Sequence, residues 1–379
     1  MIDTKLAEQP IDVQMQAGHN IINSNLRKGE PNKNRNLVFK NPSVLVKKTD
    51  KEVVIPVNKL PTVQLFSREK VMSTKGKARK SDQREELMNF AKESEDKPLA
   101  IIEHDTMDKL KVLGEQFPNF MEVVDRYRES LVLLSLAENV PIWFPPMLLV
   151  GPAGVGKTRF LSDLAKVINT GFYPIDMSTI TTGAVLSGGS SQWADSKPGF
   201  VTNSLRDSAV ANPIILIDEV DKASGDTRYN PIGSLYALLE KHTASRFVDE
   251  FLEVPMDCSH INWVASANYE QQIPEPIRSR MEVFHIQLPS ASNTQVIALN
   301  IFRELLIEEE VWGQYFTNSL SDEVLNSLQG IAPREIRKTL RKACGHVVER
   351  MGRESKQFTL TADDIYLPEQ VKSRPMGFI

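Results

Sequence analysis

Residues 148–150 read Leu-Leu-Val and run directly into Gly-Pro-Ala-Gly-Val-Gly-Lys-Thr at 151–158, which a helical pattern follows from Arg159. The short apolar run predicts a buried strand, and the eight residues after it have the spacing G-x-x-x-x-G-K-[ST]. A strand, a glycine-rich loop and a helix in this order form the setting in which that spacing binds phosphate. The stretch therefore predicts a nucleotide-binding α/β fold built around this loop.

Each residue type in the loop has a chemical reason. Glycines permit backbone angles and a close approach that side chains would block, so the loop N–H groups can point at the phosphates. Lys157 places a positive charge near the β- and γ-phosphates, and Thr158 offers its hydroxyl to Mg²⁺. The implied cofactors are ATP and Mg²⁺. The expected binding residues are Gly151, Pro152, Ala153, Gly154, Val155, Gly156, Lys157 and Thr158.

A second motif is the apolar run at 213–219, Pro-Ile-Ile-Leu-Ile-Asp-Glu, which ends in two carboxylates. A parallel strand buried on both faces has this continuous apolar pattern, and its carboxyl end is where ligands bind in open α/β sheets. We expect Asp218 to hold Mg²⁺ through water, and Glu219 to deprotonate the attacking water as a general base. The pair alone could equally be a solvated acidic turn, but the phosphate loop upstream favours the catalytic interpretation.

Short apolar strands alternate with helical patterns from residue 147 to residue 288, which is typical of an α/β domain with a mostly parallel sheet. Helical patterns also precede the first strand, from residue 104, and only helical runs follow Pro289. We expect an α/β phosphate-loop NTPase domain at 104–289 and a small all-helical lid domain with a tail at 290–379. The expected strands are Met147–Val150, Ile214–Ile217, Ile261–Ala267 and Val283–Leu288.

Residues 1–103 differ from the rest, because Asn, Lys, Gln and Pro are frequent and apolar runs are brief. Between Arg68 and Arg84, seven basic residues stand against only Glu69 and Asp82. Such a composition buries too little apolar surface to offset chain entropy, so we expect a largely irregular, partly disordered segment. Two interpretations stay open: a solvated arm, or an adaptor that docks a partner, with nucleic acid as one candidate for the basic stretch.

Composition narrows the class of protein. The 379 residues carry a net charge of −4, which points neither to nucleic acid nor to an acidic partner. The two cysteines, Cys258 and Cys344, form no paired motif, and the N-terminus lacks the apolar core of a signal peptide. The most apolar stretch is too short to span a bilayer. We therefore expect a cytoplasmic protein without membrane association.

Taken together, residues 146–288 resemble the ATPase module of Lon proteases, within the AAA+ superfamily. The loop at 151–158 and the stretch 212–222, with its Asp218-Glu219 pair, are general to that superfamily. More specific to the Lon branch are Phe-Leu-Glu-Val-Pro-Met-Asp at 251–257, Ala-Ser-Ala-Asn at 265–268 and Ile-Arg-Ser-Arg-Met-Glu at 277–282. The resemblance continues more weakly to about residue 351.

The resemblance implies roles for further residues. Asn268 matches the polar sensor of the γ-phosphate or attacking water, a role that suits an amide because it both donates and accepts. Arg280 matches the arginine finger that reaches a neighbouring subunit's nucleotide, with Arg278 as a second candidate. Arg334 matches the second sensor on the lid, with Arg337 as its alternative. For each arginine, a surface salt bridge is the competing interpretation.

Trp193 matches the aromatic residue that Lon-like ATPases carry on a loop facing the central pore. Glycines before it would allow movement, and a large flat side chain can hold varied polypeptide by non-specific contact. The alternative is a tryptophan that packs under its own loop. Tyr229 falls near the family's second pore loop. The serine–lysine protease domain and the N-terminal substrate domain of Lon have no recognisable counterpart here, so we do not expect proteolysis by this chain.

Three function hypotheses follow from the motifs and the resemblance. The first is an ATP-hydrolysing motor, in a homo-oligomeric and by resemblance hexameric ring, that remodels or threads a protein substrate. The second is a motor or loader associated with nucleic acid through residues 68–84. The third is a switch in which ATP binding alone assembles a complex.

Overall fold

The computed structural model describes residues 60–78, 81–92, 96–193, 195–223 and 232–367. These residues all lie in the compact unit Val54–Ile379. Tyr229 lies outside the described ranges.

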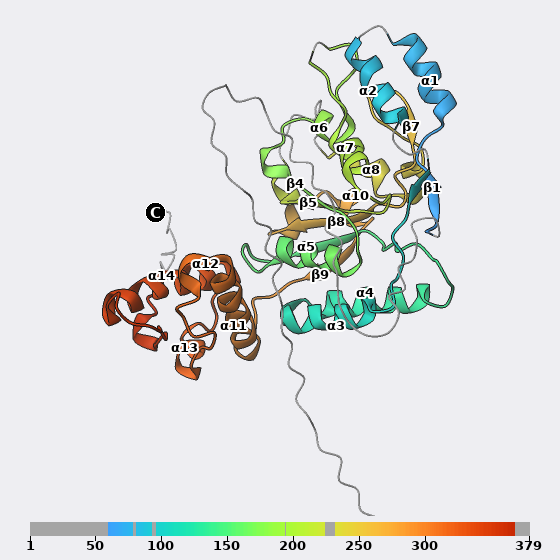
Figure 1. Cartoon of the computed structure of the whole chain (residues 1–379). Helices are drawn as coiled ribbons and strands as arrows, with labels where there is room; N and C mark the ends of the chain where they lie inside the picture. Colours follow the sequence, from blue (N-terminus) through green and yellow to red (C-terminus); the bar gives the residue numbers. More distant parts are fainter. Residues whose placement is uncertain (1–59, 79–80, 93–95, 194, 224–231, 368–379) are drawn as a thin grey trace, which may run out of the picture. The chain divides into compact units, whose positions relative to one another are not determined.

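A five-stranded parallel sheet forms the centre of the α/β part (Figure 1). Its strands lie in the order β4-β5-β8-β3-β9, so the strand before the phosphate loop lies between β8 and β9. In this register Val150 stands beside Ala267 on one side and His285 on the other. The carboxyl ends of β3, β5 and β8 therefore lie side by side, and the chain leaves all three strands at the same end of the sheet. The strands are β3 Met147–Val150, β4 Phe172–Asp176, β5 Ile214–Asp218, β8 Asn262–Ala267 and β9 Glu282–His285.

Both faces of the sheet are buried, which explains the uninterrupted apolar runs of β3 and β5. Along β3, Leu148 packs into one core cluster and Leu149 into the other, as the period of two requires. The second cluster draws on the helices drawn below the sheet in Figure 1, and the first on those drawn above it. These helices are α3 Thr106–Gln116, α4 Met121–Leu134, α5 Lys157–Val167, α6 Ala184–Ser187, α7 Phe200–Asp207, α8 Leu235–Leu238, α9 Lys241–Ala244 and α10 Glu275–Arg278.

The described part of the N-terminal segment departs from the irregular structure we expected. It forms β1 Thr62–Gln64, α1 Arg68–Lys77, α2 Ser81–Lys92 and β2 Asp96–Pro98, with β1 antiparallel to β2. Leu65, Phe66, Val71 and Leu87 are buried in the first core cluster. The average composition of the segment did not indicate these helices and strands, because a few well-spaced apolar side chains are enough to pack a helix against an existing core.

A separate all-helical core follows the sheet, as the sequence predicts. Its main helices bury one face each around Phe302, Leu340 and Val347, and the bridge between Phe316 and Phe358 closes the cluster. The described helices here are α11 Ala291–Glu308, α12 Glu310–Gly313, α13 Asp322–Ser327 and α14 Pro333–Met351. We call residues 290–367 the lid.

The four expected strands are confirmed, β3 at both ends and the others to within three residues at each end, and the α/β class with a helical lid is confirmed. One strand of the five-stranded sheet, β4, was not predicted. Its sequence, Phe-Tyr-Pro-Ile-Asp, carries Pro174 in the middle, which argues against a central strand. The sheet tolerates this proline because β4 lies at the edge.

Two further short strands, β6 Phe247–Val248 and β7 Pro255–Met256, pair antiparallel as a hairpin outside the main sheet.

Candidate nucleotide-binding site

The phosphate loop is held in a form that only glycine permits at three positions. It joins β3 to α5, and Gly154 and Gly156 have φ of 81° and 106°. A Cβ added at Gly151 would lie 2.2 Å from the carbonyl oxygen of Ile286. Positive φ is strained for other residues, and the close approach to Ile286 excludes any side chain. The expected glycine roles therefore match the backbone geometry.

Lys157 lies inside the loop as a buried cation with 8% of its surface exposed. Its Nζ donates to the carbonyl of Gly151 at 2.6 Å and to Oδ1 of Asn268 at 3.3 Å. Burial lowers the pKa of Lys157, and the nearby charge of Asp218 offsets part of that shift. The structure thus brings the lysine and the expected sensor amide together across two neighbouring strands.

Thr158 and Asp218 supply two hard oxygen ligands side by side. The Thr158 hydroxyl donates to Oδ2 of Asp218 at 3.0 Å. Oδ1 of Asp218 accepts from the Ser266 hydroxyl and, at 3.1 Å, from the backbone N–H of Glu219. Hydroxyl and carboxylate oxygens are the ligand types that Mg²⁺ takes beside a nucleotide. This donor set fits the expected metal role of both residues.

Among the described residues, no cluster of three or more His, Cys, Asp or Glu side chains is arranged to hold a metal ion.

Glu219 follows the strand directly and adopts a left-handed backbone conformation, with φ of 54°. Such a conformation is uncommon for a residue with a side chain and is often found at functional sites. Its carboxylate forms an ion pair with Lys222 at 2.8 Å and is about one-third exposed. A carboxylate at this place has the acceptor oxygens that a general base needs.

Two residues of this network were not predicted as site residues. Asp221 is buried, and its Oδ2 accepts the backbone N–H groups of Asn268 and Tyr269, each at 3.0 Å. Ser266, 1% exposed, holds Asp218. The signal for Asp221 was a third carboxylate just after Asp218 and Glu219. Nothing in the spacing indicated Ser266, because its contact depends on the pairing of β5 with β8.

Arg278 ends α10 and Arg280 follows the helix by two residues, and both contact carboxylates of their own chain. Arg280 forms an ion pair with Glu240 at 2.6 Å and donates to the carbonyl of Pro276 at 2.6 Å. Arg278 approaches Glu270 at 3.6 Å. Within the described residues, Arg280 is therefore bound to Glu240, and its expected contact with a neighbouring subunit remains a prediction.

Arg334 meets the phosphate loop from the lid. Its backbone N–H donates to the carbonyl of Gly154 at 3.2 Å, and its positive charge contributes to the lowered pKa of Lys157. Its side chain is exposed. Arg337, the alternative second sensor, instead pairs with Glu308 inside the lid. Of the two arginines, the geometry favours Arg334.

Trp193 is 59% exposed on the loop between α6 and α7. A tryptophan packed beneath its own loop would be mostly buried, so this exposure argues against that interpretation. The ring borders an open hollow of about 580 Å³ together with Val185, Pro198 and Phe200.

Comparison with known proteins agrees with this geometry. Residues 147–289 match the family described as "ATPase family associated with various cellular activities (AAA)". These residues are an AAA ATPase domain. Hydrolysis of ATP is accordingly the activity of this part of the chain, and the matched range contains every site residue named above except Arg334 and Arg337.

Over a stretch longer than the AAA domain, the chain is similar to Lon proteases. It is 28% identical to the Lon protease of Clostridioides difficile over 260 residues, which are 65% of this chain and 32% of that protein. To the mitochondrial Lon protease homolog of Aspergillus niger it is 30% identical over 254 residues, 65% of this chain and 23% of the homolog. A peroxisomal Lon protease homolog of Oryza sativa is 39% identical over 145 residues. The matches therefore span between about a sixth and a third of these relatives.

None of the helices in the described ranges combines the length and the apolar character needed to cross a membrane.

Proposed function

We propose that the chain is an ATP-driven motor that remodels a protein substrate or threads it through the pore of a hexameric ring. The observation that carries the proposal is an exposed tryptophan on a glycine-flanked loop in the same domain as the hydrogen-bonded pairs Lys157–Asn268 and Thr158–Asp218. A nucleotide-binding switch needs the network but has no evident use for the exposed ring.

Bound ATP would supply the phosphoryl group, and Mg²⁺ would supply positive charge that neutralises the negative charge of the phosphates. Lys157 and the loop N–H groups bind the phosphates, while Thr158 and Asp218 hold the metal. Glu219 accepts the proton of the attacking water, and Asn268 orients that water or the γ-phosphate through its amide. Lys157 already touches Asn268 at 3.3 Å, which supports a shared task.

Two arginines would complete the nucleotide site, Arg334 from the lid of the same chain and Arg280 from the neighbouring subunit. Arg334 approaches from the lid, where its N–H bonds the loop at Gly154. Arg280 would leave Glu240 and reach the next subunit's nucleotide, where its guanidinium neutralises charge that develops in the transition state. The ion pair that it gives up is partly exposed and contributes at most about 1 kcal/mol, so it does not prevent the exchange.

Polypeptide-stimulated ATP turnover tests the proposal. We expect an unfolded polypeptide to increase turnover, and Trp193→Ala to abolish that increase. Tyr366→Ala serves as the matched control, because Tyr366 is similarly exposed, at 64%, but belongs to the lid. If Trp193→Ala is stimulated like the unmodified chain, the threading role is wrong. The same reactions, examined for cleaved polypeptide, test the expectation that this chain performs no proteolysis.

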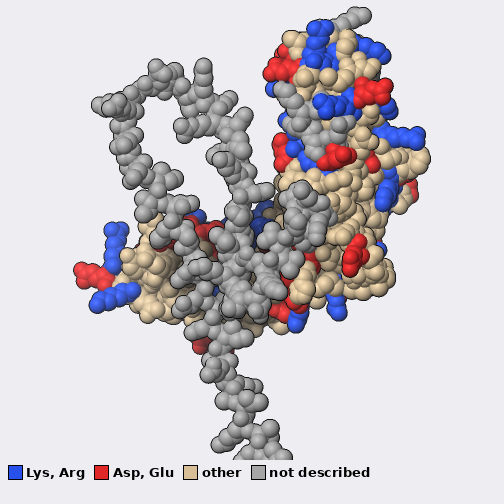
Figure 2. Space-filling view, turned by 45° about the vertical axis from the view of Figure 1, so that its right-hand side comes forward, with Lys and Arg blue, Asp and Glu red and all other residues tan. Residues whose placement is uncertain are grey.

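The nucleic-acid alternative receives less support from the described residues. Helix α1 carries four basic residues against Glu69, but α2 adds Asp82, Glu85 and Glu86 beside Arg84, and Glu86 pairs with Arg206. Acidic and basic side chains lie side by side on the face of the molecule seen in Figure 2. A nucleic-acid surface would carry an excess of one sign. Stimulation by DNA or RNA that falls steeply with salt, without stimulation by polypeptide, would replace the proposed function with this alternative.

A further inference from the structure

The loop that carries Trp193 is fastened at its base by a buried carboxylate. Asp249 follows the short strand β6 and is 0% exposed. Its Oδ2 accepts from the N–H of Gly199 at 2.7 Å and from the hydroxyl of Thr202 at 2.6 Å. Its Oδ1 accepts from the N–H groups of Phe251 and Leu252 at 2.9 and 3.1 Å. Four hydrogen bonds thus satisfy an anion that is completely removed from water.

The two ends of the loop meet at this carboxylate. A Cβ at Gly188 would lie 2.4 Å from Oδ1 of Asp249, and Gly188 has φ of 87°. A Cβ at Gly199 would lie 2.3 Å from the backbone nitrogen of Gly188. Glycine at both positions lets the chain enter and leave the loop within contact of Asp249.

The segment 249–253 makes two further contacts with the loop. The N–H of Glu250 donates to the carbonyl of Ser187 at 2.8 Å. At the other end, Ser191 donates to the carboxylate of Glu253 at 2.5 Å, two residues from Trp193. We call residues 249–253 the clasp. It contacts the loop on both sides of its base and once near its tip.

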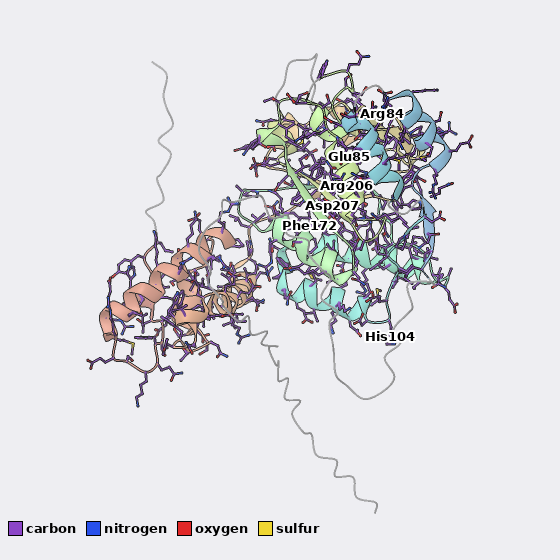
Figure 3. All side chains as sticks on the ribbon, turned by 45° about the horizontal axis from the view of Figure 1, so that its top comes forward. Arg84, Glu85, His104, Phe172, Arg206 and Asp207 are labelled. Carbon is purple, nitrogen blue, oxygen red and sulfur yellow. The ribbon has the colours of Figure 1, made fainter. Side chains whose placement is uncertain are left out.

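Helix α2 is attached to the same assembly. The buried amide of Gln83 donates to the carbonyl of Phe251 at 2.8 Å, so α2 contacts the clasp directly. Glu86 pairs at 3.1 Å with Arg206, near the end of the helix that follows the loop. In Figure 3 the labels of Arg84 and Glu85 on α2 stand above those of Arg206 and Asp207 on α7, and Figure 1 groups α2, α7 and β7 at one end of the α/β part.

We propose that Asp249 is the positioning residue of the Trp193 loop, and that the clasp links the position of this loop to helix α2. A shift of α2 would then alter how firmly the loop is held. The contribution of the clasp to substrate gripping rests on the proposed function, whereas the fastening of the loop does not.

Hydrogen exchange of the full chain tests the fastening without any substrate. In Asp249→Asn the amide keeps one acceptor but turns an NH₂ group toward donors, so amides of 188–200 should exchange about tenfold faster. Exchange at 151–158 should stay unchanged. The matched control is Asp364→Asn, which neutralises a similarly buried carboxylate in the lid, 3% exposed, and should leave 188–200 unchanged.

Two milder variants keep the test decisive if Asp249→Asn folds poorly. Thr202→Val keeps the shape of the side chain but removes the hydroxyl that donates to Asp249. Gln83→Leu removes the hydrogen bond from α2 to the carbonyl of Phe251 in the clasp. Each should accelerate exchange of 188–200 about threefold. Unchanged exchange in Thr202→Val and Asp249→Asn would overturn the positioning role, and unchanged exchange in Gln83→Leu would overturn the link to α2.

Polypeptide titrations separate positioning from general damage. Asp249→Asn should raise the polypeptide concentration for half-maximal ATPase stimulation about tenfold, with maximal turnover within about twofold of the unmodified chain. A loss of maximal turnover without that shift would contradict positioning. If exchange accelerates but Trp193→Ala retains normal stimulation, the clasp stands and the proposed gripping role fails instead.

Discussion

Replacing Asp221 by asparagine should disturb both stability and turnover, because this carboxylate holds the backbone beside Asn268. Its Oδ2 accepts two N–H groups at 3.0 Å, in a site where Asp221 is 8% exposed. Each hydrogen bond to a buried charge contributes about 1.5–3 kcal/mol, and a neutral acceptor about half of that. The substitution should therefore lower the free energy of unfolding by about 1.5–3 kcal/mol.

Turnover should fall further than stability alone explains. Asn268 contacts Lys157 at 3.3 Å, so a shifted backbone moves the amide relative to the phosphate site. A displacement that costs about 1.4–2.7 kcal/mol in the transition state corresponds to a 10- to 100-fold lower kcat. Urea unfolding followed by circular dichroism and steady-state turnover at saturating ATP measure the two effects.

The control separates the two effects. Asp364→Asn should also destabilise the fold, because Asp364 accepts from Thr361 and pairs with Arg350 in the lid, but it should change kcat by less than about twofold. An Asp221→Asn chain whose unfolding free energy stays within about 0.5 kcal/mol and whose kcat stays within about twofold would refute the positioning of Asn268 by Asp221.

Three further predictions concern single groups. Burial lowers the pKa of Lys157, so its side chain should lose its proton at a lower pH than an ordinary lysine does, and ATP affinity should fall as the pH rises through that lower range. An ATP affinity, measured by fluorescent-nucleotide titration, that stays constant up to the pH at which an ordinary lysine loses its proton would contradict the prediction. Burial raises the pKa of both thiols, that of Cys344 to about 12. Cys258 and Cys344 should therefore resist iodoacetamide at pH 8 in the folded chain and react in urea. Detection by mass spectrometry of either cysteine alkylated in the folded chain would contradict this prediction. Arg334→Ala should lower turnover about tenfold or more and Arg337→Ala less than about threefold, since Arg337 pairs within the lid; the reverse order in kinetic measurements would assign the second sensor to Arg337.

Local signals were sufficient for the parts of the site that lie in one stretch of chain. The loop at 151–158 combines its strand, its glycines and its helix within about twenty residues, and the carboxylates at 218–219 end an apolar run. Backbone geometry at Gly154 and Gly156 agrees with what the spacing requires. Such features are predictable because the residues that cause them are neighbours in sequence.

Contacts between distant segments could not be predicted in the same way. Ser266 reaches Asp218 because β8 pairs with β5, and Asp221 reaches Asn268 across the same two strands. The pair of Arg280 with Glu240 likewise joins residues 40 positions apart. The polar composition around α1 and α2 predicted irregular structure, because the core onto which Leu87 packs is formed by much later residues.

ATP turnover of Glu219→Gln, measured with nucleotide affinity on the same preparation, tests the central claim that this domain hydrolyses ATP with Glu219 as general base. The substitution preserves the size of the side chain but removes its basicity, and such a base typically contributes 10²- to 10⁴-fold to the rate, on the order of 3–5 kcal/mol. We expect ATP affinity within about threefold of the unmodified chain and turnover reduced at least about a hundredfold. Turnover within about threefold of the unmodified chain would exclude Glu219 as the general base.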